Sequence, residues 1–71
     1  MNKTATGPQL LALRRLPAPG QPPADRPRHA HRSTLQRLID RGLVEEVEPG
    51  LYRRTDAGEA LVRKAEALWA I

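Results

Sequence analysis

Arginines are the side chains of this sequence best suited to recognising another molecule. Ten of its twelve basic residues are arginines, and a guanidinium presents a planar fork of donors that matches phosphate or guanine. The charge is also uneven, because residues 1–42 carry a net charge of +6 and residues 43–71 carry −2. We therefore expect a polyanionic partner on the first half of the chain.

Other chemistries find few suitable residues. The chain has no cysteine, which excludes disulfides and thiolate zinc sites. His29 and His31 are better suited to a loop or a pH-sensitive phosphate contact than to a metal. Ser33 is the lone serine, and we find neither paired carboxylates on a pocket-forming face nor a glycine-rich phosphate loop. We expect no enzyme, no cofactor and no metal site.

The length of 71 residues allows one domain, which we place at residues 7–71 after a flexible tail at 1–6. No apolar run approaches the roughly 18 residues that cross a bilayer. Arginines interrupt the early apolar stretch, which argues against a secretory signal. We therefore expect a cytoplasmic protein without membrane contact. Because so small a core is marginally stable, association with a second copy is a further expectation.

Local signals divide the chain into elements that would position the arginines. Gly7-Pro8 begins an amphipathic helix of roughly 8–16, which Pro17 ends. Five prolines in residues 17–27 exclude a regular helix or strand there, and "PPAD" allows at most a single turn. The basic segment 26–32 follows this proline-rich segment.

The helix of residues 33–41 has the clearest start and end. Ser33 and Gln36 form a capping box, and Gly42 suits a left-handed C-terminal cap. An apolar stripe of Leu35, Leu38 and Ile39 predicts its buried face.

A β-hairpin and a last helix follow. Residues 43–47 and 51–55 read as two strands around Glu48-Pro49-Gly50. Thr55 caps the closing helix, whose final residues "EALWAI" are expected to pack on helix 8–16 or on a second copy.

The stretch "STLQRLIDRGLVEEVEPGLYRRTDAGEALV" resembles the second half of a winged helix-turn-helix domain, and it is most similar to MarR-type and related small bacterial regulators. The resemblance covers about residues 33–65. The matching residues stand in the family's order: Leu35, Leu38, Arg41, Gly42, Leu43, Val44, Glu45, Tyr52, Thr55, Gly58, Leu61 and Val62. Here a proline-rich segment occupies the place of the family's preceding helix, and the wing is short.

The resemblance implies an α+β winged helix that binds double-stranded DNA sequence-specifically, as a small transcriptional regulator of bacterial or phage type. It places the N-terminal part of helix 33–41 in the major groove. Base-edge candidates are then Ser33, Thr34 and Arg37, with Gln36 as a neighbour, and phosphate candidates are Arg28, His31, Arg32 and Arg41. The family also suggests a homodimer through the C-terminal helix.

Two alternatives remain open on the residues alone. Arg53 and Arg54 alternate on the second strand, so one faces out, where it contacts either a phosphate or Glu45 or Glu46 across the hairpin. The whole domain is alternatively a winged-helix module for protein–protein interaction that does not bind DNA. The acidic hairpin and the short wing favour that second interpretation.

Overall fold

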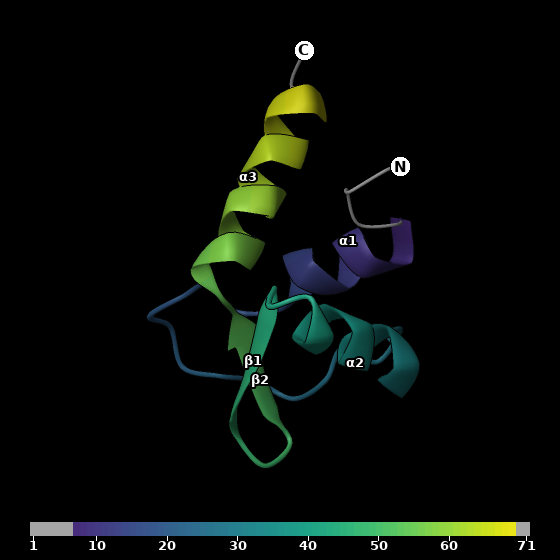
Figure 1. Cartoon of the computed structure of the whole chain (residues 1–71), viewed down its shortest axis with the longest axis vertical. Helices are drawn as coiled ribbons and strands as arrows, with labels where there is room; N and C mark the ends of the chain where they lie inside the picture. Colours follow the sequence, from purple (N-terminus) through teal and green to yellow (C-terminus); the bar gives the residue numbers. More distant parts are fainter. Residues whose placement is uncertain (1–6, 70–71) are drawn as a thin grey trace.

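The computed structural model describes residues 7–68 in full and the backbone of Trp69. Three helices and one hairpin follow each other in the order α1 (Gly7–Arg15), α2 (Arg32–Asp40), β1 (Val44–Glu48), β2 (Leu51–Arg54) and α3 (Asp56–Trp69). Figure 1 shows α2 beside the hairpin, α1 above α2, and α3 rising from the end of the hairpin opposite its turn. The expected α+β class is confirmed. The expected flexible tail at residues 1–6 lies outside the described residues.

The proline-rich segment folds without a helix, as its five prolines require. α1 ends just before Pro17, and the chain then wraps around the hairpin to reach α2 (Figure 1). One residue of this segment joins the sheet: Ala24 pairs with Tyr52 through N–H···O bonds of 2.8 and 3.0 Å. The "PPAD" stretch therefore contributes a bridge to the sheet, because Ala24 is held against the free edge of β2.

Helix α2 begins one residue earlier than the sequence predicts. His31 is its N-cap residue, in an extended conformation and without a side-chain capping bond. The predicted capping box was therefore wrong, because Ser33 lies inside the first turn and is exposed. The predicted end is confirmed: Gly42 has φ +76°. Its N–H bonds the carbonyl of Ile39 at 2.9 Å, and the next N–H bonds that of Leu38, which is the Schellman pattern.

The hairpin is antiparallel, and its register places Val44 opposite Arg54 and Glu45 opposite Arg53. β1 lies one residue later than the predicted 43–47, and β2 ends one residue before the end of the predicted 51–55. A bulge between Glu46 and Glu48 shifts the register near the tip. The tip is the dipeptide Pro49-Gly50, with φ +81° at the glycine. Proline followed by a positive-φ glycine is the pattern of a type II turn.

The core lies where α1, α2, β1 and α3 meet. Leu13 and Leu38 are its fully buried large side chains. The remaining buried apolar residues come from every element except β2, and they are Ala12, Leu16, Ala30, Leu35, Leu43, Val44 and Val62. Since Ala30 precedes α2, the loop contributes to the core that holds this helix. The predicted buried stripe of α2 is confirmed, with Ile39 only partly buried.

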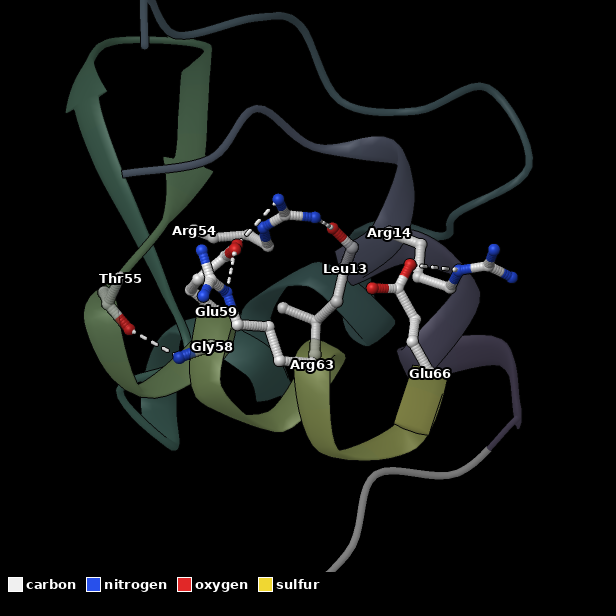
Figure 2. Close-up of polar contacts among 8 residues, drawn as sticks. All are labelled: Leu13, Arg14, Arg54, Thr55, Gly58, Glu59, Arg63 and Glu66. Carbon is white, nitrogen blue, oxygen red and sulfur yellow. Dashed lines mark hydrogen bonds and ion pairs between the residues drawn. The ribbon is translucent and has the colours of Figure 1, made fainter. Parts of the chain in front are cut away.

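Thr55 and Gly58 join α3 to the rest of the molecule. The hydroxyl of Thr55 accepts the Gly58 N–H at 3.1 Å and donates to the carbonyl of Gly42 at 2.6 Å, so the predicted N-cap is confirmed (Figure 2). A Cβ atom at Gly58 would overlap the carbonyl oxygen of Leu43. Glycine is required here because the backbone of α3 crosses that of Leu43 directly.

The C-terminal turns of α3 extend beyond the core (Figure 1). Leu68 is 64% exposed, so this residue of "EALWAI" is not covered by α1 as one expectation had it. The side chain of Trp69 and residues 70–71 lie outside the described residues. Within residues 7–69, no helix has both the length and the apolar character that a membrane crossing requires.

Candidate nucleic-acid interface

The outer face of α2 carries polar and cationic side chains, and its inner face holds the helix on the core. Arg32, Ser33, Gln36 and Arg37 are exposed, whereas Thr34 is half-buried. Residues Leu35 and Leu38 are buried on the opposite side. The structure therefore exposes most of the predicted DNA-binding residues of this helix to solvent.

The segment before α2 extends the same cationic character. Arg26, Arg28 and His31 are all exposed. Within residues 7–69, the side chains of Arg28, Arg32 and Arg37 make no hydrogen bond or ion pair. The described residues also contain no cluster of three His, Asp or Glu side chains that could hold a metal ion. These three guanidinium groups are available for an external anion.

Two polar contacts fix the C-terminal end of α2. Gln36 Nε2 donates to Asp40 Oδ1 at 2.9 Å, one helical turn on. Arg41 Nη1 donates to Gln9 Oε1 of α1 at 3.0 Å. Arg41 is exposed, but this contact directs it towards α1 and away from the start of α2.

Arg53 forms a cross-strand ion pair, which is one of the two alternatives that the sequence left open. Its Nε lies 3.0 Å from Glu45 Oε2, the residue directly opposite in the hairpin. Its Nη1 donates to the carbonyl of Gln21 at 3.0 Å. Arg53 therefore ties the proline-rich segment to the sheet and neutralises one acid of β1.

Arg54 points into the molecule, with its side chain only 12% exposed. Its Nη1 donates to the Leu13 carbonyl at 3.1 Å, and its Nη2 lies 2.7 Å from Glu59 Oε1. Figure 2 shows these residues together with Arg63, whose Nε bonds Glu59 Oε2 at 3.0 Å. We name Arg54, Glu59, Arg63 and the Leu13 carbonyl the arginine–glutamate corner. The corner joins α1, β2 and α3, and sequence reasoning did not anticipate it.

The charge state of Glu59 follows from these contacts. The hydrogen bond from Arg63 lowers the pKa of the Glu59 carboxyl below its ordinary value, and the charges of Arg54 and Arg63 act in the same direction. Partial burial opposes them and is outweighed. The carboxylate form is therefore favoured in the folded protein.

A cavity of about 450 Å³ opens between α2, the hairpin and the loop that follows Ala24. From α2 it is lined by Arg32, Leu35, Gln36 and Ile39, and its other walls come from Asp25, Arg26, Glu46, Gly50 and Tyr52. Sequence reasoning did not find it, because the pairing of Ala24 with Tyr52 is what brings Asp25 and Arg26 opposite α2. One side of the candidate interface is thus concave and carries both signs of charge.

Comparison of the chain with protein-family models, with curated proteins and with solved structures finds no match.

Proposed function

We propose that this chain is a winged-helix protein that binds double-stranded DNA sequence-specifically and acts as a small transcriptional regulator of bacterial or phage type. The observation that carries the proposal is the division of α2 into two faces. Leu35 and Leu38 anchor the helix, while Arg32 and Arg37 stand in solvent without a side-chain partner within residues 7–69. A rigid helix with free guanidinium groups is well suited to the major groove.

The arrangement of elements supports the same proposal. A helix, a hairpin and a closing helix follow each other as in a winged helix, and Gly42, Thr55 and Gly58 make the joints between them. The proline-rich segment takes the place of the helix that normally precedes the recognition helix. Ala30, in the basic segment that follows it, is buried, so the loop before α2 can support the start of this helix in place of a helix.

We propose different roles for the predicted residues. The exposed Arg37 and Ser33 would contact base edges, with the half-buried Thr34 beside them, and the exposed Arg28, His31 and Arg32 would contact phosphates. The side chains of the remaining predicted residues have partners inside the domain. Gln36 is hydrogen-bonded to Asp40 and Arg41 to Gln9, while Arg53 is paired with Glu45 and Arg54 with Glu59. We therefore leave Arg53 and Arg54 out of the proposed interface.

Fluorescence anisotropy of a labelled random duplex at several salt concentrations tests the proposal. If one copy neutralises about four phosphates, log affinity should fall against log salt with a slope near −3.6. Selection from a random duplex pool then tests sequence specificity. Failure to bind any duplex at low salt, or binding that does not respond to salt, would contradict the proposal.

Arg63→Ala is a matched control for these measurements. Arg63 is a helical arginine with its side chain 77% exposed, and it lies on α3, outside the proposed interface. It should leave both affinity and salt slope unchanged. An equal loss of affinity in Arg63→Ala and Arg28→Ala would show that net charge alone drives the association.

A module for protein–protein interaction without DNA binding is the second candidate. Exposed apolar side chains favour it, because Leu11 is 41% and Leu68 is 64% exposed. The same residues would serve a homodimer through α3, which we propose as the accompanying assembly. Light scattering beside the anisotropy experiment separates these cases: a dimer that binds duplex supports the first proposal, and a chain that binds no duplex supports the second.

A further inference from the structure

The cavity between α2 and the hairpin has its own chemistry, distinct from that of the outer face of α2. Its volume of about 450 Å³ lies within the range of roughly 300 to 1,000 Å³ typical of small-molecule sites. Three separate segments of the chain form its walls. Its shape therefore depends on the folded domain and on no single helix.

Charged side chains of both signs face this cavity without pairing with each other. Arg26 and Arg32 supply cations, and Asp25 and Glu46 supply carboxylates. Among the described residues, neither arginine lies within ion-pair distance of either acid. Glu46 Oε2 instead accepts the backbone N–H of Gly50 at 3.0 Å, which orients the carboxylate at the cavity wall. Both signs of charge remain available to an occupant.

The other lining groups are suited to a planar ligand that carries hydrogen-bond donors. Leu35, Ile39 and Tyr52 provide apolar and aromatic surface. Gln36 also lines the cavity, and because its amide nitrogen donates to Asp40, its carbonyl oxygen is left as an acceptor. Carboxylate and amide oxygens accept hydrogen bonds from the amino groups of nucleobases.

We propose that this cavity binds one nucleotide unit. Arg26 and Arg32 would hold the phosphate, for which guanidinium groups are well suited. Asp25, Glu46 and Gln36 would accept hydrogen bonds from the base or sugar, and the apolar surface would cover the base. All four charged side chains are exposed and therefore hydrated before a ligand binds. A simple inorganic anion or a purely apolar ligand offers no donor to the two carboxylates, so a ligand with a phosphate and several donors fits the lining best.

This inference does not require duplex binding, because the cavity is lined mainly by residues outside the proposed DNA contacts. The nucleotide unit has two sources: a free nucleotide, or a nucleotide of an unpaired strand. Because Arg32 and Gln36 line the cavity and also belong to the outer part of α2, an occupant would compete with a duplex for these two residues.

Amide chemical shifts of the full-length ¹⁵N-labelled chain test the proposal. The chain is titrated separately with inorganic phosphate, adenosine, AMP and CMP. We expect AMP or CMP to bind at least tenfold more tightly than phosphate or adenosine alone. Their shifts should concentrate at the three cavity walls, residues 25–26, 32–39 and 46–52.

Two cavity variants and one control locate the site. Arg26→Ala and Arg32→Ala should each weaken nucleotide binding about tenfold, while Arg63→Ala on α3 should bind as the wild type does. The amide spectrum itself shows whether each variant is folded. If a variant loses its fold, the wild-type shift map and the comparison with phosphate still decide the question.

A single-stranded tetranucleotide distinguishes the two sources. If the tetranucleotide binds more tightly than AMP and shifts the same residues, the site binds a nucleotide of an unpaired strand. If the tetranucleotide binds more weakly than AMP, the site binds a free nucleotide. The proposal is overturned if AMP and phosphate bind equally, if the shifts lie elsewhere, or if both folded arginine variants bind AMP normally. If one of these results is obtained but the chain still binds duplex in the anisotropy experiment, only the nucleotide site is refuted. The proposed DNA-binding function is then unaffected.

Discussion

Strand β2 and helix α2 each present a pair of arginines, and the two pairs have different surroundings. On β2, Arg53 pairs with Glu45, and Arg54 is enclosed by Glu59 and the Leu13 carbonyl. On α2, Arg32 and Arg37 are exposed and have no side-chain partner within residues 7–69. Identical side chains thus hold the fold together in one region and remain available in the other.

The acids of the second half of the chain account for this difference. β1 and α3 contribute Glu45 and Glu59 within reach of β2, whereas Asp40 on α2 accepts a hydrogen bond from Gln36. A buried guanidinium needs a carboxylate or carbonyl partner, since desolvating it alone is strongly unfavourable. The net charge of a segment therefore says less about binding than the partners of each arginine do.

The largest expected effect lies at the joint that supports both regions. Gly58→Ala should lower the free energy of unfolding by about 3 kcal/mol, because the added Cβ overlaps the Leu43 carbonyl. Thermal unfolding followed by circular dichroism measures it. Gly7→Ala is the matched control, since its Cβ would meet open space. Equal melting temperatures for the two variants would contradict this account of the joint.

A second test removes the enclosed arginine. Arg54→Met keeps most of the apolar stem but loses the hydrogen bond to the Leu13 carbonyl and the ion pair with Glu59. We expect a loss of stability of about 2 kcal/mol. Under conditions where the variant stays folded, duplex affinity should equal that of the wild type. A specific loss of DNA affinity with unchanged stability would reverse our assignment of Arg54.

The converse result is expected on α2. Arg37→Ala should weaken duplex binding roughly tenfold, about 1.4 kcal/mol, and relax specificity at one base position. Its stability should change by less than about 0.5 kcal/mol, because the side chain is exposed and forms no hydrogen bond or ion pair within residues 7–69. Anisotropy measures the duplex affinity of this variant, and thermal unfolding of the same samples measures its stability. A destabilised variant with normal DNA binding would break the comparison.

A smaller effect is expected for the exposed pair of the hairpin. Arg53→Ala removes the contact with Glu45, whose side chain is 45% exposed, and the hydrogen bond to the Gln21 carbonyl. The loss of stability should be about 1 kcal/mol, because a surface ion pair contributes about 0.5 kcal/mol and the hydrogen bond adds a similar amount. A double-mutant cycle with Glu45→Gln isolates the pairwise contribution. A coupling free energy as large as the stability loss in Arg54→Met would show that Arg53 and Arg54 stabilise the fold equally.

The smallest expected effect is a loss of stability at acid pH, caused by protonation of Glu59. Because the folded-state pKa of Glu59 is lowered, its contribution to stability is present above the unfolded-state pKa and is lost as pH falls through the folded value. The melting temperature of the wild type should therefore fall more steeply below about pH 4.5 than that of Glu59→Gln. Parallel curves would show that the corner does not depend on this carboxylate.

The sequence by itself determined the elements whose signals are local. Prolines ended α1 and excluded a helix from the following segment, Gly42 ended α2, and Thr55 capped α3. These residues act through their own backbone geometry or through a bond within one turn, so neighbouring residues suffice to predict them. The start of α2 was missed by one residue: His31 is the N-cap residue, and Ala30 just before it is buried in the core, which the local capping pattern of Ser33 does not encode.

Only the tertiary structure decided which arginines are enclosed and where a cavity opens. Arg54 meets Leu13 across 41 positions of sequence, and Asp25 and Arg26 face α2 because Ala24 pairs with Tyr52. Such contacts depend on the register of the sheet and on the close crossing of α3 at Gly58. No local pattern encodes them, since each arises from segments that the chain brings together only on folding.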